Sequence, residues 1–171
     1  MCGIIGYIAN NENQILEKKF DFYFNQQNHR GPDYKQKLKF SLNKNYVCLG
    51  FNRLSIIDVS TNSNKIFNDD NYSLLFNGEI YNFLYLKKKY LSQHKLETDT
   101  DTEVLFKLLI LKKEKIFEEL EGMFSIVFLN KKNKTLILSR DYTGIKPLYY
   151  SIYSNGIFFS SEAWFQYSIS S

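Results

Sequence analysis

The chain has 171 residues, of which 44% are hydrophobic and 17% aromatic, which is enough to fill the core of one domain. It carries 22 Lys and Arg against 18 Asp and Glu, a formal net charge of +4, and its lysine clusters are short and without a nucleic-acid-binding signature. No apolar run approaches the ~20 residues that a membrane-spanning helix needs. These features exclude a wholly disordered chain and predict neither a nucleic-acid nor a membrane partner.

The first predicted element is a short strand over Cys2–Ile8, which is apolar and contains Gly3 and Gly6. Asn-rich residues 10–13 end this strand. Apolar residues at imperfect helical spacing then predict a helix over Gln14–Gln26. A loop with defined turn chemistry follows over His29–Asp33, because a proline stands between a glycine and an aspartate.

Two strands, Lys35–Leu42 and Tyr46–Phe51, are expected to pair around residues 43–45. Extended chain is predicted to continue over Leu54–Val59, and a polar loop over Ser60–Asn71. The order of strand, turn and strand indicates an antiparallel hairpin.

A compact apolar strand over Tyr72–Phe76 is expected to stop at Asn77-Gly78, since glycine permits backbone geometry that other residues resist. The next predicted helix is Leu84–Leu91. The Thr- and Asp-rich residues 98–103 read as a cap that leads into an amphipathic helix beginning Val104-Leu105-Phe106.

The last part of the chain predicts two hairpins. One joins strands Gly122–Leu129 and Leu136–Arg140, and the other joins Leu148–Tyr153 and Ile157–Ser161 across Asn155-Gly156. Because strands come mostly as hairpins and helices come in blocks, the predicted class is α+β with antiparallel sheets. No glycine-rich phosphate-binding motif follows a strand, which disfavours a doubly wound nucleotide fold.

Cys2 is the first candidate catalytic residue. Removal of Met1 would leave a cysteine with both a thiol and a free α-amine, and an amine of pKa about 8 is a suitable base for the thiol. Alternatively, Cys2 opens a buried strand as a small hydrophobe. Cys48 lies in an apolar strand pattern and is expected to be inert core. The two cysteines could pair, but a reducing cytoplasm fits better because no signal peptide precedes Cys2.

Four separated segments carry residues that are unusual as structure alone: Cys2, Arg53–Asp58, Asn77–Asn82 and Asp101. With the motifs His29–Asp33, Leu120–Phe124 and Ser139–Tyr150, they make the chain resemble the glutaminase domain of asparagine synthetase, a class II glutamine amidotransferase. The resemblance covers residues 2 to about 162, with its motifs in order. It implies an N-terminal-nucleophile hydrolase fold, an αββα sandwich of two mainly antiparallel sheets flanked by helices.

The same resemblance implies a set of site residues. Those for catalysis are Cys2, Asn77 and Gly78, and those for glutamine binding are Arg53, Leu54, Ser55, Ile56, Ile57, Asn77, Gly78, Glu79 and Asp101. Leu54–Ile57 would line the pocket through their backbone. No metal site is expected, because the two cysteines and two histidines lack metal-ligand spacing.

Each implied role is matched by a physical task. Glutamine is a zwitterion with a terminal amide, so Arg53 suits its carboxylate and Asp101 suits its ammonium group. Asn77 and Gly78 can donate an amide NH₂ and a backbone N–H to an oxyanion. Simpler alternatives stay open: Arg53 in a surface ion pair, Asp101 as a helix cap, and Asn77-Gly78 as a plain β-turn.

His29 raises the further hypothesis of a Cys-His dyad, as in papain-like proteases. The resemblance disfavours it, because the similar family uses the N-terminal amine as base. Arg30 and Asp33 are instead expected to fix the loop through ion pairs and turn bonds, and Arg140 and Asp141 to do likewise.

The expected function is hydrolysis of L-glutamine to glutamate and ammonia by a single glutaminase domain over residues 1–171, in an asparagine-biosynthetic system of the cytoplasm. The partner would be an ammonia-accepting synthetase domain or subunit, and a homodimer is left open. This domain needs no cofactor; ATP and Mg belong to a synthetase domain, whose pyrophosphate-binding motif is absent from these residues. The chain would be a truncation, a split gene product or a freestanding domain, lacking its last strands and so with an exposed sheet edge.

Two other functions remain as alternatives. One is a degenerate, non-catalytic module that binds glutamine or regulates a partner. The other is an N-terminal-nucleophile hydrolase of a different amide, which would need the nucleophile but not both Arg53 and Asp101.

Overall fold

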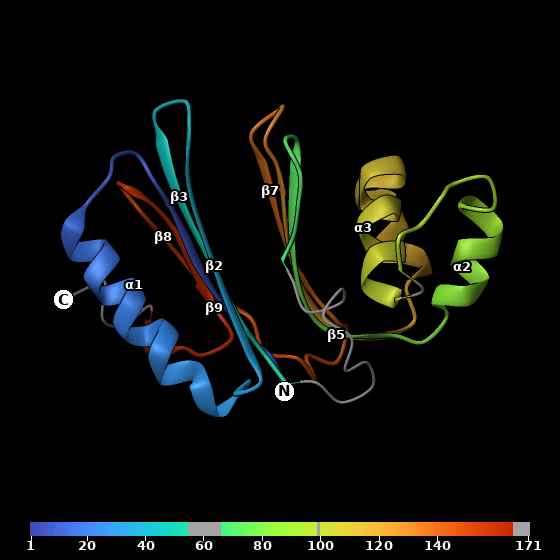
Figure 1. Cartoon of the computed structure of the whole chain (residues 1–171), viewed down its shortest axis with the longest axis horizontal. Coiled ribbons are helices and arrows are strands. Elements are labelled where there is room, and N and C mark those ends of the chain that lie inside the picture. Colours follow the sequence, from blue (N-terminus) through green and yellow to red (C-terminus); the bar gives the residue numbers. More distant parts are fainter. Residues whose placement is uncertain (55–65, 99, 166–171) are drawn as a thin grey trace. The chain divides into compact units, whose positions relative to one another are not determined.

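The computed structural model describes residues 1–54, 66–98 and 100–165. The chain forms two compact units, Met1–Ile57 with Pro147–Ser171 and Asp58–Lys146. Each unit is built around one antiparallel sheet, with strand order β2-β3-β1-β9-β8 in the first and β4-β5-β6-β7 in the second (Figure 1). The predicted α+β class with antiparallel sheets is confirmed.

In its described residues, the first unit contains five strands and one long helix. The strands are β1 (Gly3–Ala9), β2 (Tyr34–Leu42), β3 (Asn45–Arg53), β8 (Tyr149–Tyr153) and β9 (Gly156–Ser160), and the helices are α1 (Gln14–Gln26) and a 3₁₀ turn (Gln27–His29). Helix α1 has the predicted bounds. The two predicted hairpins also form, β2 with β3 and β8 with β9, and their ends differ from the prediction by one or two residues.

Helix α1 lies along one face of the first sheet (Figure 1). It begins after Asn13, whose side-chain oxygen accepts hydrogen bonds from the N–H groups of Ile15 and Leu16. At helical spacing, Leu16, Phe20 and Phe24 then face the sheet. They pack with the buried residues Ile5, Tyr7, Ala9, Cys48 and Phe158. This core fixes β1 in the middle of the sheet.

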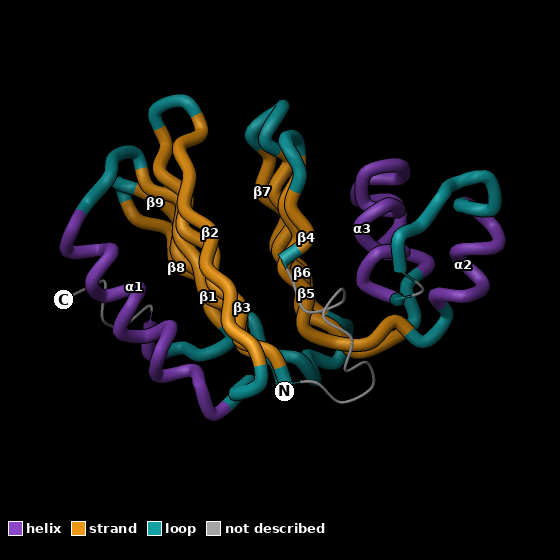
Figure 2. The backbone as a smooth tube through the Cα atoms, in the orientation of Figure 1, coloured by secondary structure: helices purple, strands orange, loops and turns teal. Residues whose placement is uncertain are grey.

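The described part of the second unit contains four strands and several helices (Figure 2). They are β4 (Phe67–Asn68), β5 (Tyr72–Ile80), β6 (Gly122–Asn130), β7 (Thr135–Arg140), α2 (Phe83–Tyr90), α3 (Asp101–Lys112) and a 3₁₀ helix (Lys113–Glu119). Among the described residues, no helix is long and apolar enough to cross a membrane.

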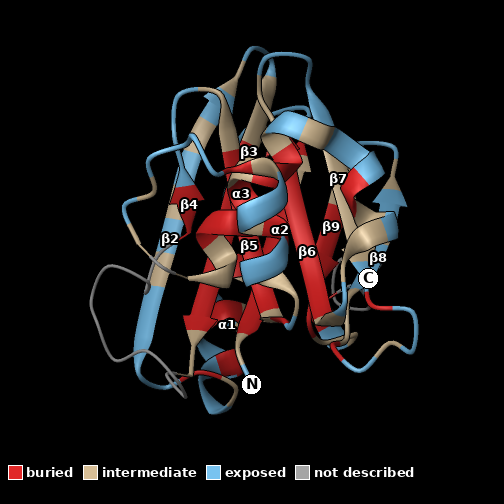
Figure 3. Ribbon diagram, turned by 90° about the vertical axis from the view of Figure 1, so that its right-hand side faces the viewer, coloured by how far each residue is buried: buried red, intermediate tan, exposed pale blue. Residues whose placement is uncertain are grey.

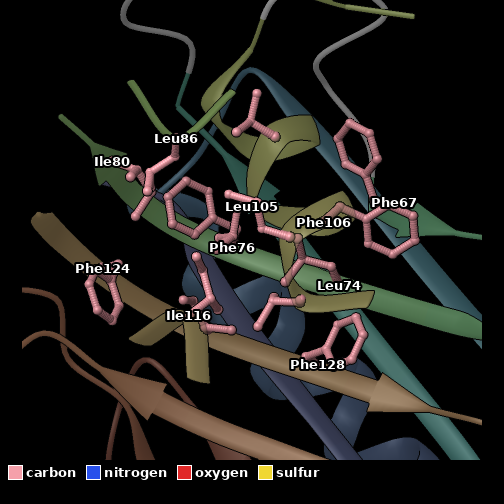
Figure 4. Packing of buried hydrophobic residues seen from close by; sticks show 14 of the residues in the cluster. Phe67, Leu74, Phe76, Ile80, Leu86, Leu105, Phe106, Ile116, Phe124 and Phe128 are labelled. Atoms are coloured by element: carbon pink, nitrogen blue, oxygen red, sulfur yellow. The ribbon is translucent and has the colours of Figure 1, made fainter. Parts of the chain in front are cut away.

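Alternate residues of β5 and β6 build the core of the second unit. Leu74, Phe76 and Ile80 of β5 lie in one buried cluster with Phe124, Ile126 and Phe128 of β6 and with the apolar face of α3. Figure 4 shows Leu105 and Phe106 of α3 packed among these side chains. Figure 3 shows β6 buried along most of its length.

The strand ending expected at Asn77-Gly78 is wrong, because β5 continues through both residues to Ile80. Asn77 lies opposite Ser125 and Gly78 opposite Phe124 in the ladder with β6. A Cβ atom on Gly78 would lie 2.1 Å from the carbonyl oxygen of Met123, so glycine is required here by the approach of β6. The β-turn interpretation of Asn77-Gly78 is therefore wrong as well.

The polar loop expected over Ser60–Asn71 is also only partly right. Its end contains the short strand β4, which pairs with β5 through Phe67 and Leu74. Most of the extended segment predicted over Leu54–Val59 lies outside the described residues.

Asp141 fixes the loop after β7, as predicted. Its carboxylate is buried and accepts hydrogen bonds from the backbone N–H groups of Phe124 (3.1 Å), Ile145 (2.8 Å) and Lys146 (3.0 Å). The hydroxyl of Thr143 donates a fourth. Burial acts to raise the pKa of this carboxyl, but the hydrogen bonds outweigh burial and lower the pKa to about 2.

We expect the substitution Asp141→Asn to lower the free energy of unfolding by roughly 2 kcal/mol, because an amide NH₂ would face backbone donors. Since the native pKa of Asp141 lies below its value of about 3.9 in an unfolded chain, its contribution is complete above about pH 4 and is lost as the pH falls to about 2. Urea unfolding at a series of pH values measures both effects.

Asp21→Asn is the matched control, because Asp21 makes an exposed ion pair with Lys37 and should cost less than about 1 kcal/mol. Equal losses in the two variants, or an unchanged pH dependence in Asp141→Asn, would contradict the assignment.

Candidate functional site

The predicted site residues of the first unit meet at one end of its sheet. Cys2 directly precedes β1, and its half-buried thiol points to the carbonyl oxygen of Leu54 at 3.8 Å. Because Gly3 pairs with Asn52, the register sets Cys2 beside Arg53 at the end of β3. Cys2, Arg53 and Leu54 are therefore neighbours, whereas Ser55, Ile56 and Ile57 lie outside the described residues.

The backbone of Arg53 is held from β2 and from the predicted loop. Arg53 pairs with Tyr34 in the sheet, and its carbonyl oxygen accepts a hydrogen bond from the N–H of Asp33 at 3.1 Å. Gly31 allows the loop to come this close, since a Cβ atom there would lie 2.3 Å from the carbonyl oxygen of Asn52. The loop over His29–Asp33 thus supports the end of β3 that carries Arg53.

Arg30 of the same loop reaches the backbone of the proposed nucleophile. Its Nε donates to the carbonyl oxygen of Cys2 at 3.1 Å, and its Nη1 lies 3.3 Å from Oε1 of Glu162. The expected role of Arg30 in fixing the loop is confirmed by this ion pair.

The ring of His29 has partners other than Cys2. Its Nε2 lies 2.9 Å from Oε1 of Glu162, and its Nδ1 lies 2.9 Å from the carbonyl oxygen of Gln26. Both ring nitrogens are therefore engaged in holding the loop, which argues against a Cys-His dyad.

Sequence analysis missed Glu162. The signal was weak but present: Glu162 is the only acidic residue in the segment Pro147–Ser171, and it stands where the family resemblance ends.

The predicted site residues of the second unit also lie together. Asn77, Gly78 and Glu79 are consecutive near the end of β5, and Asp101 begins α3. One oxygen of the Asp101 carboxylate accepts a hydrogen bond from the N–H of Ile80 at 3.0 Å, which ties α3 to this end of β5.

Asn77 carries a buried donor that is not used by the described protein groups. The residue is 2% exposed, and its Nδ2 has no hydrogen-bond partner among the described residues. Leaving such a donor unpaired costs about 1–3 kcal/mol, so a buried unpaired amide calls for an explanation such as a ligand.

Ser125 is a second residue that sequence analysis missed. It lies opposite Asn77 in the ladder, so the two side chains share one face of the sheet. The hydroxyl of Ser125 is fully buried and also has no partner among the described residues. Only the strand register could have revealed this pair.

Asp101 is not the cap of α3, so that alternative is wrong. The cap is Thr100, whose hydroxyl accepts a hydrogen bond from the N–H of Glu103 at 3.3 Å.

Burial raises the pKa of the Asp101 carboxyl, and the negative charge of Glu79 adds to the rise. The hydrogen bonds from Ile80 and Thr102 act in the opposite direction. A cation bound nearby would relieve this cost, which suits the ammonium group of an amino acid.

Both cysteines are free, and they differ in their surroundings. Cys48 is fully buried in the core against α1, and burial raises the pKa of its thiol to about 11. Its expected role as inert core is confirmed. In the part of the chain that the structure describes, no group of His, Cys, Asp and Glu is arranged to hold a metal ion.

Comparison with known proteins gives a consistent result. The family model described as glutamine amidotransferase domain matches residues 1–165. Asparagine synthetase [glutamine-hydrolyzing] 1 of Bacillus subtilis is 36% identical over 95% of this chain and 26% of its own length. A putative asparagine synthetase [glutamine-hydrolyzing] 2 of Methanocaldococcus jannaschii is 34% identical over 95% of this chain and 34% of its own length. The chain thus spans about a quarter to a third of these relatives.

Among solved structures, glutamine phosphoribosylpyrophosphate amidotransferase of B. subtilis, complexed with ADP and GMP, is similar over 99% of this chain and 44% of its own, with a TM-score of 0.67 and 19% identity. At this identity the likeness shows the fold alone. It agrees with the expected N-terminal-nucleophile hydrolase type of fold.

Proposed function

The chain belongs to the glutamine amidotransferase domain family, and we propose that it hydrolyses L-glutamine to glutamate and ammonia through a thioester on Cys2. The observation that carries the proposal is the buried amide of Asn77, which directly precedes Gly78 and whose Nδ2 has no partner among the described residues. A buried donor of this kind suits the oxyanion of an amide under attack, because its cost in the free protein is recovered when negative charge develops.

In the proposed mechanism, each site residue takes the role that the family resemblance implies for it. Arg53 binds the α-carboxylate and Asp101 binds the α-ammonium group, with Glu79 and the backbone of residues 54–57 completing the pocket. These contacts hold the side-chain amide for attack by the Cys2 thiol.

The chemistry needs a free α-amine on Cys2. That amine takes the thiol proton, and the sulfur attacks the side-chain amide carbon while Asn77 and the N–H of Gly78 donate to the oxyanion. Collapse of the tetrahedral intermediate breaks the C–N bond, and the amine returns its proton to the departing ammonia. Water then cleaves the glutamyl thioester, which releases glutamate and restores the thiol. A retained Met1 would turn the amine into an amide nitrogen, which is not a useful base.

We further propose that the ammonia is consumed by a synthetase domain or subunit of the asparagine synthetase type. The names of the relatives and the fraction of their length that this chain spans support this assignment. ATP and Mg are expected only for that partner. The family model includes segments of both compact units, which supports a single glutaminase domain, and a thiol nucleophile fits a reducing cytoplasm.

The two alternatives make different demands on the same residues. A degenerate module would bind glutamine without turning it over. A hydrolase of another amide would keep Cys2 and Asn77 but would be indifferent to loss of Arg53 or Asp101, since these two residues serve the amino-acid end of the substrate.

We expect Cys2→Ala to lower glutamate release from glutamine by about 10³-fold or more, since the variant lacks the thiol that forms the thioester. Glutamine should still bind, which calorimetry measures. Cys48→Ala is the matched control and should keep turnover, because Cys48 is buried core. Turnover that survives in Cys2→Ala would contradict the mechanism.

Arg53→Ala should raise KM for glutamine by about 10- to 100-fold, which corresponds to the loss of a charge-assisted hydrogen bond, with a smaller effect on kcat. Lys132→Ala removes an exposed lysine from the turn before β7 and serves as control. An unchanged KM in Arg53→Ala, measured by steady-state glutamate release, would remove Arg53 from the substrate pocket.

A further inference from the structure

The residues that follow β9 hold the beginning of β1. The N–H of Ser161 donates to the carbonyl oxygen of Ile4 at 2.8 Å, and the hydroxyl of Ser161 accepts from the N–H of Ile4 at 2.9 Å. The N–H of Glu162 donates to the hydroxyl of the buried Ser160 at 3.1 Å. The backbone of Glu162 is thereby fixed close to the start of β1.

From this fixed backbone, the Glu162 carboxylate reaches the loop that supports Cys2. Its Oε1 lies 3.3 Å from Nη1 of Arg30, and Nε of the same guanidinium donates to the Cys2 carbonyl oxygen at 3.1 Å. The side chains of Arg30 and Glu162 are only 10% and 17% exposed, so solvent screens their attraction less than on an open surface.

The sheet register sets where Cys2 lies, but the ladder of β1 with β3 begins at Gly3, one residue after Cys2. Within the described ranges, the contact of the thiol is a long one, 3.8 Å to the carbonyl oxygen of Leu54. The hydrogen bond from Arg30 therefore contributes strongly to the orientation of the Cys2 backbone. A misplacement of about 1 Å at a reacting group can cost 10²-fold in rate.

We propose that Glu162 is a positioning residue for the nucleophile: its carboxylate holds the Arg30 guanidinium against the Cys2 carbonyl and so fixes Cys2 for attack. This inference rests on the proposed function for the reaction that Cys2 performs. The hold on Cys2 is itself a property of the free protein. A free arginine side chain samples many rotamers, and the Glu162 carboxylate favours the one in which the guanidinium reaches Cys2.

The side-chain chemistry separates positioning from a mere effect of charge. Glu162→Gln removes the negative charge but keeps an oxygen that can accept from Arg30, whereas Glu162→Ala removes both. A positioning role predicts that the Glu162→Gln variant keeps most of the activity that the Glu162→Ala variant loses. A purely electrostatic role predicts equal losses in the two variants.

The experiment uses the full chain, with loss of Met1 verified by intact mass. Two quantities are measured: the steady-state kcat and KM for glutamine, and the rate at which iodoacetamide alkylates Cys2 in the absence of glutamine. Buried Cys48 serves as the internal reference for folding in the alkylation assay. Thermal unfolding of each variant reports its stability, and assays run well below the lowest Tm.

We expect Glu162→Ala to lower kcat by about tenfold or more, with KM changed by less than about threefold, because the ground-state pocket is intact. Alkylation of Cys2 should depart from the wild-type rate, because the backbone that carries the thiol is no longer held in one orientation. Glu162→Gln should lie near wild type in both measurements. His29→Ala removes the other partner of the same carboxylate oxygen, one that is largely exposed, and should have the smaller effect.

A double-mutant cycle shows whether Glu162 acts through Arg30. In an Arg30→Ala background, Glu162→Ala should cause no further loss of kcat or change in alkylation rate. If the effects of Arg30→Ala and Glu162→Ala on kcat and on the alkylation rate instead multiply in full in the double variant, the proposal is overturned. A Glu162→Ala variant with lower Tm but wild-type kcat and alkylation rate would also overturn it, since Glu162 would then serve stability alone.

Failure of the proposed function looks different from failure of this inference. Wild-type protein without glutamate release, or release that survives in Cys2→Ala, would refute the function. The alkylation assay needs no glutamine, so it would still decide whether Glu162 positions Cys2.

Discussion

The structure of the first unit depends on the antiparallel register between β1 and β3. Strand β1 is the central strand of its sheet, paired with β3 on one side and β9 on the other, and its face toward α1 is fully buried. A shift of one residue would move Ile5, Tyr7 and Ala9 to the opposite face of the sheet and break their packing with α1, so the register is strongly fixed. Because Gly3 pairs with Asn52, the same register sets residue 2 beside the end of β3, where Arg53 and Leu54 lie. The packing of an apolar core thus determines the neighbours of the proposed nucleophile.

A corresponding constraint operates in the second unit. Strand β5 stays paired with β6 through Asn77 and Gly78, and the missing side chain at Gly78 allows the two backbones to approach. The ladder buries the Asn77 amide without giving it a partner among the described residues. Asp101 closes the same end of β5 through its bond to Ile80, at the cost of a raised carboxyl pKa. Groups that are unfavourable in the free protein are expected where a ligand is to be bound.

The sequence predicted local structure better than the site. Helix Gln14–Gln26 and the hairpins followed from periodicity and turn residues, which act over a few positions. The prediction failed at Asn77-Gly78, because a dipeptide typical of turns also meets the separate demand of a close strand partner. The alternative of Asp101 as the helix cap failed, because its neighbour Thr100 takes the cap position within the predicted capping segment. The contacts of Glu162 and Ser125 could not be predicted. The contact of Ser125 depends on strand register, and that of Glu162 on a residue more than a hundred positions away. The roles of the site residues came from family resemblance and remain proposals.

The central claim is that Cys2 attacks glutamine with its own α-amine as base, and trapping of the intermediate tests it most directly. One preparation is divided, and one half is treated with methionine aminopeptidase to free Cys2. Both halves are mixed with glutamine, quenched in acid and digested, and the peptide that contains Cys2 is weighed by mass spectrometry. The account predicts a glutamyl thioester on Cys2 in the chain that lacks Met1, and none in the chain that keeps it. An equal adduct in both chains, or steady turnover of glutamine with Cys2 never modified, would contradict the account.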